Sequence, residues 1–136
     1  MSDDRLALVQ SFFTRYFDGH IDEALTLLEP TAVYHVPGGV PLAGDFVGPA
    51  EVARHLRKFL DLTGDAIDVL SWDDWLIGTI DIAGVVRVHL QRPGRAQEFR
   101  FVFLVDVRDI RLRILNFRLG CRECAPFWSW RFSRFR

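Results

Sequence analysis

The strongest constraint on the fold is a change in hydrophobic spacing close to residue 66. Before this point apolar residues recur every three or four positions, which is typical of amphipathic helices. After it they alternate with other residues, which is typical of strands with one buried face. The alternation is clearest over Glu98–Val107, where phenylalanine or valine occupies every second position. The pattern predicts an α+β fold, with helices first and strands second.

The first part of the chain predicts three helices, over residues 6–17, 21–28 and 49–63. Pro30 ends the second helix, and Pro49 suits the first turn of the third, because proline lacks the amide hydrogen that a helix interior needs. A short strand is expected at Thr31–Val36, and residues 37–48 are expected to form a loop.

The second part predicts four strands in an antiparallel meander. The expected strands are residues 67–77, 80–91, 98–107 and 110–119. The alternation slips near Ile114-Leu115, which predicts a bulge in the last strand. Long strands twist and curl, so we expect a cone-shaped, curved antiparallel sheet wrapped around the three helices.

Length and composition favour one folded domain. A chain of 136 residues with 49% apolar residues can fill one core, which excludes a disordered protein. No apolar run approaches the roughly 18 residues that cross a bilayer. The start of the chain lacks the basic-then-apolar pattern of a secretory signal. We therefore expect a cytoplasmic protein with no membrane contact.

The formal net charge of −1 conceals two opposed halves. Residues 1–86 hold 14 acidic and 5 basic residues, whereas residues 87–136 hold 4 acidic and 12 basic ones. This polarity predicts an acidic helical side and a basic sheet face. The face opposite the core mixes Leu104 with Arg87, His89 and Arg100, which is typical of a dimer surface or of a solvated face.

The order of elements, the length and the segment Tyr34–Leu56 (YHVPGGVPLAGDFVGPAEVARHL) resemble the SnoaL-like branch of the nuclear transport factor 2 superfamily, which includes ketosteroid isomerase. The resemblance extends to about Leu119. We therefore divide the chain into a cone domain, residues 1–120, and a tail, residues 121–136, that belongs to the same domain or to a dimer contact. The resemblance implies a pocket between the concave sheet face and the helices, and a homodimer.

The ketosteroid isomerases use a carboxylate base, a tyrosine and a protonated aspartate. At the corresponding positions this chain has His35, Phe12 and Phe103. Two of these three side chains have no proton to give or take, so steroid isomerisation by that mechanism is not expected. The SnoaL cyclases place a catalytic acid at the end of the last strand, where this chain reads Leu-Gly-Cys over residues 119–121. Polyketide cyclisation is disfavoured accordingly.

His35 is the main candidate catalytic residue, because an imidazole can act as general base or acid near neutral pH. The alternative is a structural histidine packed beside Tyr34. Asp73 or Asp74 could orient His35 or pair with Arg118. For these two aspartates the alternative is a bulge or turn in which both carboxylates are solvated.

The expected pocket takes a small, largely apolar ligand, and its lining comes mostly from the concave face. The candidate lining residues are Phe12, Tyr16, Trp75, Val86, Val88, Phe101, Phe103 and Asn116. Tyr16 and Trp75 could each donate a hydrogen to a ligand, but such aromatic residues are more often plain core, and Asn116 is equally consistent with an exterior position.

Cys121 and Cys124 are the only cysteines. A single Cys-x-x-Cys spacing supplies half of a zinc site, so an incidental disulfide is favoured over redox activity or a metal. The tail Phe127–Arg136 alternates aromatic residues with arginines, and packing is favoured over nucleic-acid or membrane binding. We expect no cofactor, no metal and no nucleic-acid partner.

Two functions from different classes remain open. One is a cofactor-independent isomerase, lyase, hydratase or cyclase in which His35 moves a proton. The other is a non-catalytic ligand-binding or homodimeric interaction domain. A pocket closed by aromatic side chains, with no convergent polar groups, would favour the second.

Overall fold

The computed structural model describes residues 4–36, 43–64, 67–92, 95–108 and 111–119, and for 92, 95, 108 and 111–119 it describes the backbone alone. The helices are α1 (Asp4–Phe17), α2 (Ile21–Leu25) and α3 (Gly48–Thr63). The strands are β1 (Leu28–Val36), β2 (Gly44–Val47), β3 (Asp68–Ile77), β4 (Asp81–Arg92), β5 (Arg95–Arg108) and β6 (Arg111–Leu119).

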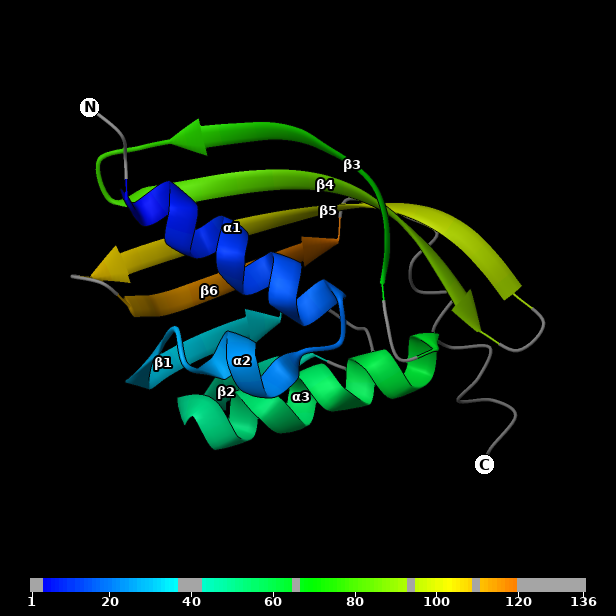
Figure 1. Cartoon of the computed structure of the whole chain (residues 1–136), viewed down its shortest axis with the longest axis horizontal. Helices are drawn as coiled ribbons and strands as arrows, with labels where there is room; N and C mark the ends of the chain where they lie inside the picture. The colour runs from blue at the N-terminus through cyan, green and yellow to red at the C-terminus, as the bar shows by residue number, and fades with distance from the viewer. Residues whose placement is uncertain (1–3, 37–42, 65–66, 93–94, 109–110, 120–136) are drawn as a thin grey trace.

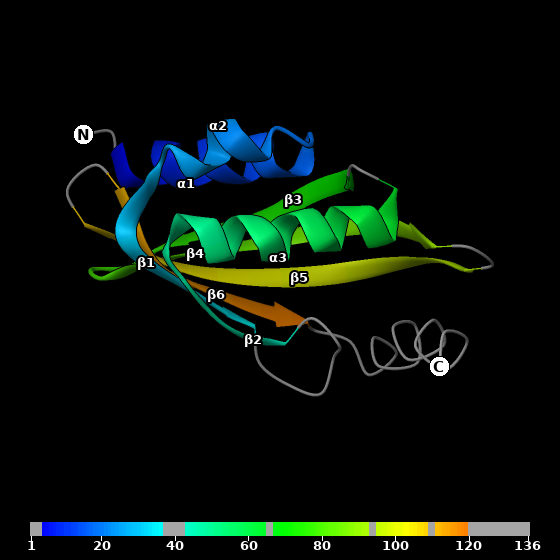
Figure 2. The ribbon, with the colours of Figure 1, turned by 90° about the horizontal axis from the view of Figure 1, so that it is seen from below.

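The strands form one curved sheet in the order β2-β1-β6-β5-β4-β3 (Figure 1). All neighbouring strands are antiparallel except β1 and β6, which run parallel. The three helices lie together on one face of this sheet (Figure 2). The predicted α+β fold, with helices packed on a curved and mainly antiparallel sheet, is confirmed.

Helices α1 and α3 form where the apolar spacing predicts them. Helix α1 turns Phe12, Phe13, Tyr16 and Phe17 into the core, at the positions that one helix face brings together. Helix α3 has proline in its first turn and ends at Gly64, whose φ of 88° is left-handed and whose amide donates to the carbonyl of Leu60.

The N-terminal strands differ from the prediction in two places. The second helix is shorter than expected, and β1 starts at Leu28 and passes through Pro30. Proline is tolerated there because the register against β6 is irregular between Leu28 and Val33, where a ladder amide is not required. The expected loop over residues 37–48 also contains a strand, β2, which pairs with β1. Pairing with a distant strand is not encoded in local spacing.

Strands β3 and β6 both contain bulges. In β3 the register against β4 shifts between Val69 and Ser71 and again between Trp72 and Asp74. In β6 it shifts at Leu112–Ile114, opposite Asp106 and Val107, so the slip predicted near Ile114-Leu115 is present about one residue earlier. Each extra residue bends its strand and helps the sheet to curve around the helices.

The core is an aromatic cluster between α1, α3 and the inner face of the sheet. Phe13 packs on Phe103 with ring centroids 4.0 Å apart, and Phe59 contacts Phe101 at 6.2 Å. At the β3 edge, Trp72 stacks on Phe17 at 5.9 Å. The predicted helical stripes and strand alternation thus meet in a single hydrophobic core.

Candidate functional site

His35 lies on the sheet face that points away from the helices. Its neighbours Tyr34 and Val36 are buried on the inner face, whereas 38% of the His35 side chain is exposed. Its Nδ1 donates to Oδ1 of Asp45 on the paired strand β2, at 2.7 Å. Because a carboxylate only accepts, Nδ1 carries the hydrogen and Nε2 is left as an acceptor.

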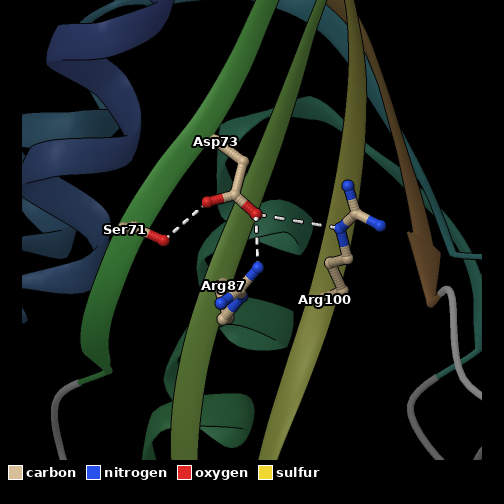
Figure 3. A network of polar contacts seen from close by, with 4 residues as sticks. All are labelled: Ser71, Asp73, Arg87 and Arg100. Atoms are coloured by element: carbon tan, nitrogen blue, oxygen red, sulfur yellow. Dashed lines mark hydrogen bonds and ion pairs between the residues drawn. The ribbon is translucent and has the colours of Figure 1, made fainter.

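Asp73 sits in the β3 bulge and belongs to a polar network on the same outer face (Figure 3). Ser71 Oγ donates to its Oδ1 at 2.6 Å, Arg87 donates to its Oδ2 at 3.2 Å, and Arg100 Nε lies 3.8 Å from Oδ2. The Ser71 hydrogen bond contributes most to lowering the pKa of Asp73. The charges of Arg87 and Arg100 add to it against an opposing effect of burial.

The structure does not bring the four predicted catalytic residues together. Strands β6, β5 and β4 separate His35 on β1 from Asp73 on β3, and Asp45 is the carboxylate that orients His35. Asp74 is exposed on β3. Arg118 pairs in the backbone ladder with Val102, and its side chain lies outside the described part of the chain.

Most of the predicted pocket-lining residues are buried in the aromatic cluster. The fully buried ones are Phe12, Tyr16, Val86, Val88, Phe101 and Phe103. Trp75 is half-buried and stacks on Trp72 at 4.6 Å. Asn116 pairs in the backbone ladder with His35 and Leu104, and its side chain lies outside the described part. Burial raises the pKa of Tyr16 and of Tyr34, so both hydroxyls stay protonated at neutral pH.

Cavities also lie outside this cluster, and two of them lie beside α3. One, of about 500 Å³, lies between the α1–α2 turn and α3, and Asp22 and Arg57 form a 2.5 Å ion pair at its wall. The other, of about 380 Å³, lies between β2 and α3, and we refer to it as the β2–α3 cavity. Its lining residues are Ala43, Asp45, Phe46, Glu51, Arg54, His55 and Lys58.

His55 is the most unusual residue at the β2–α3 cavity. It is 4% exposed, and its imidazole packs on the rings of Phe46 at 4.4 Å and Tyr34 at 5.1 Å. It forms no hydrogen bond to any residue that the structure describes. Burial, and after it the charge of Lys58, lowers the pKa of His55 to about 4, so the imidazole is neutral at pH 7.

The charged groups at this cavity divide into two sets. Each of the two acids accepts a hydrogen bond: Asp45 accepts from His35, and Glu51 accepts from the amide of Val47 at 3.0 Å. The two cations, Arg54 and Lys58, are exposed and form no ion pair with a described residue. The cavity therefore combines one buried neutral imidazole with two positive charges that form no ion pair with a described residue.

Sequence reasoning missed His55, although a signal for it exists. The apolar stripe of α3 runs through Val52, Leu56 and Phe59, and position 55 falls on the same face. A histidine within a buried helical stripe must either find a hydrogen-bond partner or remain costly. That requirement singles it out from the other histidines once the stripe is recognised.

Two further observations concern the described residues only. No three histidine, cysteine, aspartate or glutamate side chains among them are grouped as metal ligands would be. None of the described helices is long and apolar enough to span a membrane. The Cys121–Cys124 motif and the Phe127–Arg136 segment lie outside the described residues.

Comparison with solved structures shows the fold. Bal32a from a soil-derived mobile gene cassette has a TM-score of 0.81 at 17% identity, covering 92% of this chain and 96% of that one. TerC co-crystallised with polyporic acid has a TM-score of 0.77 at 13% identity, covering 97% of each chain. A Catenulispora acidiphila protein with a ketosteroid isomerase-like fold, in complex with trimethylamine, has a TM-score of 0.74 at 8% identity, covering 90% of this chain and 92% of that one.

Comparison with curated proteins gives no match. Residues 9–113 match the SnoaL-like domain family, a range that runs from α1 through the sheet into β6 and takes in the whole β2–α3 cavity. The chain belongs to the SnoaL-like domain family.

Proposed function

We propose that this chain is a small-molecule-binding domain whose ligand occupies the β2–α3 cavity. The observation that carries the proposal is His55, a buried imidazole at the cavity wall with no hydrogen bond to a described residue. A neutral hydrogen bond between an imidazole nitrogen and a ligand group contributes about 0.5–1.5 kcal/mol. Ligand-bound structures of the same fold, with trimethylamine and with polyporic acid, support the binding of small molecules.

This proposal moves the ligand site from the concave sheet face to the edge of the sheet. The aromatic side chains of the concave face pack on one another, with Phe13 and Phe103 only 4.0 Å apart. The β2–α3 cavity has an apolar wall at Phe46 and polar groups that converge on it. Its volume of about 380 Å³ lies within the range of known small-molecule sites.

The proposal is tested by fragment binding to His55→Phe, with His20→Phe as the matched control. Phenylalanine keeps the ring that packs between Phe46 and Tyr34 but removes both nitrogens. For wild-type protein and a library of small aromatic fragments, we expect NMR shift changes centred on the amides of residues 45–58. Loss of one neutral hydrogen bond predicts roughly three- to tenfold weaker binding by His55→Phe. Shift changes centred elsewhere, or unchanged affinity of His55→Phe, would contradict the proposal.

His35 offers a route from binding to catalysis. Asp45 lines the cavity and holds Nδ1 of His35, which leaves Nε2 as the ring nitrogen that can take a proton. In this arrangement Asp45 takes the orienting role that the sequence suggested for Asp73 or Asp74. A proton moved by His35 alone, without a cofactor, fits an isomerase, lyase, hydratase or cyclase reaction.

The His35–Asp45 pair makes a measurable prediction about the tautomer of the neutral imidazole. Nitrogen-15 NMR of His35 should show hydrogen on Nδ1 in the wild-type protein. Asp45→Ala removes the acceptor, so the tautomer that is usual in solution, with hydrogen on Nε2, should then predominate. A wild-type ring with hydrogen on Nε2 would remove His35 as the base.

Homodimerisation through the outer sheet face is a second candidate function. This face carries Asp73 and Glu98 beside Arg87 and Arg100, with the apolar side chain of Leu104 37% exposed among its outer positions. In a two-fold dimer the same patch meets itself, which requires both signs of charge within one surface. The described part of the face meets that requirement.

A further inference from the structure

We infer that the ligand of the β2–α3 cavity is a small organic anion, bound with its acidic group between Arg54 and Lys58 and within reach of His55. The inference rests on the proposed function, since it names the chemistry of the ligand for that same site. It is carried by the two cations, by the state of the acids around them, and by the position of the imidazole.

Arg54 and Lys58 stand four residues apart on α3, so their side chains are neighbours on one helix face. Like charges at this spacing destabilise a helix by a few tenths of a kcal/mol. Both side chains line the cavity, and neither forms an ion pair within the described part of the chain. An anion placed between them would remove the repulsion and would gain two favourable contacts.

The two acids at the cavity have other contacts than these cations. The Asp45 carboxylate accepts from Nδ1 of His35 at 2.7 Å, and Oε1 of Glu51 accepts from the Val47 amide at 3.0 Å. Both carboxylates keep their negative charge, because their donors are neutral, but neither forms an ion pair with Arg54 or Lys58 in the described part of the chain. The two cations are therefore the groups at this cavity that an acidic ligand can pair with.

His55 lies between the two cations in sequence and is the buried member of the group. Neutral imidazole carries one N–H donor, and an anionic oxygen is a strong acceptor for it. Burial and Lys58 lower the pKa of His55, and a bound anion would oppose the effect of Lys58. The stacked rings of His55 and Phe46, 28° from parallel, offer an apolar wall for the body of the ligand.

The volume sets the size of the ligand. At roughly 30 Å³ for each water-sized group, about 380 Å³ holds a molecule of roughly a dozen non-hydrogen atoms. That size fits an aromatic ring with an acidic substituent. A large polyanion would not fit within this volume.

The test uses matched pairs of probes of the same shape that differ in charge: benzoate with benzamide, 2-naphthoate with 2-naphthamide, and indole-3-acetate with indole-3-acetamide. Affinities are measured by NMR titration of the full chain, with binding located by the amides of residues 45–58. We expect the acid of each pair to bind roughly tenfold more tightly than its amide, from two partly exposed ion pairs. Raising the salt concentration should weaken the binding of the acids and leave that of the amides unchanged.

Arg54→Gln and Lys58→Gln should each reduce the preference for the acid, and the double variant should abolish it. Arg57→Gln is the matched control, because Arg57 lies on the same helix but pairs with Asp22 at the other cavity. If the acid and amide probes bound equally well at the backbone of residues 45–58, the anion inference would be overturned and the proposed binding function would stand. Binding of no probe at the β2–α3 cavity would overturn both.

Discussion

At the scale of single residues, the proposed function makes His55 a link between stability and ligand binding. Its imidazole is buried beside a lysine and packed against two aromatic rings, which is an environment that favours the neutral form. The ring stabilises the fold through this packing, and the proposal assigns its nitrogens to the ligand. On that proposal, function and stability depend on different atoms of the same side chain.

His55 predicts a loss of stability in mild acid. Its pKa is about 4 in the folded chain against 6.5 ordinarily, so the unfolded chain binds the proton more readily between these values. The stabilisation is complete above about pH 6.5 and is lost as pH falls toward 4, a total of about 3 kcal/mol. Urea unfolding across this range should show a shallower pH dependence for His55→Phe than for wild type.

The control for this measurement is Leu56→Val, which removes one methylene from the same helix without changing a titratable group. It should lower the free energy of unfolding by a similar amount at every pH. If the free energy of unfolding of His55→Phe fell between pH 6.5 and 4 as steeply as that of the wild type, the pH dependence would not arise from this residue.

At the scale of elements, the pairing of β3 with β4 depends on a close approach between Trp75 and Gly84. The two residues face each other in the ladder, and a Cβ at position 84 would lie 2.7 Å from Cζ3 of the indole. The Trp72–Trp75 stack extends this contact along the edge of the core. Hairpin β3–β4 is also tied to α1, because the Arg5 guanidinium donates to the carbonyls of Gly78 and Thr79.

Gly84→Ala should therefore destabilise the protein by about 1–3 kcal/mol, the usual cost of overpacking. The measurement is chemical unfolding of Gly84→Ala, Trp75→Ala and the double variant. Without the indole, the added methyl group has room, so the double variant should be more stable than the sum of the single effects predicts. If the losses of unfolding free energy in the two single variants simply added up in the double variant, the indole ring would not be what excludes a side chain at position 84.

At the scale of the whole molecule, the three helices lie on one sheet face, and no described helix covers the other (Figure 2). The sequence predicted a basic sheet face. On β3–β5 the described outer face is of mixed sign instead, because the bulge in β3 brings Asp73 against Arg87 and Arg100 (Figure 3). A mixed face can pair with its own copy where a uniformly basic one would repel it.

The dimer proposal predicts a mass of twice the chain in light scattering after size exclusion. Leu104→Glu places a charge among the outer-face residues and should shift the protein to the monomer mass. Ile80→Glu is the control, since Ile80 is also an exposed aliphatic residue but lies in the β3–β4 turn, outside the sheet ladder. A monomeric wild-type protein, or a Leu104→Glu protein that remains dimeric, would contradict association through this face.

The sequence by itself determined which faces are buried. The helical stripe of α1 and the alternation in β5 predicted that Phe12, Phe13, Phe101 and Phe103 face inward, although three of them, Phe12, Phe101 and Phe103, were expected to line a pocket and are buried in the core. The proline and glycine signals placed both ends of α3. Such patterns are local, because the spacing of apolar residues follows directly from the geometry of one helix or one strand. The resemblance of the segment Tyr34–Leu56 gave the family that the chain proved to match.

Only the tertiary structure decided which polar residues meet. Strand β2 exists because β1 offers it a partner, and that pairing brings Asp45 to His35. The packing of α3 against β1 and β2 places His55 between Phe46 and Tyr34 and leaves Arg54 and Lys58 at a cavity. These contacts join residues that local spacing treats as unrelated. A single sequence carries the preference of each element, whereas a site is formed where several elements come together.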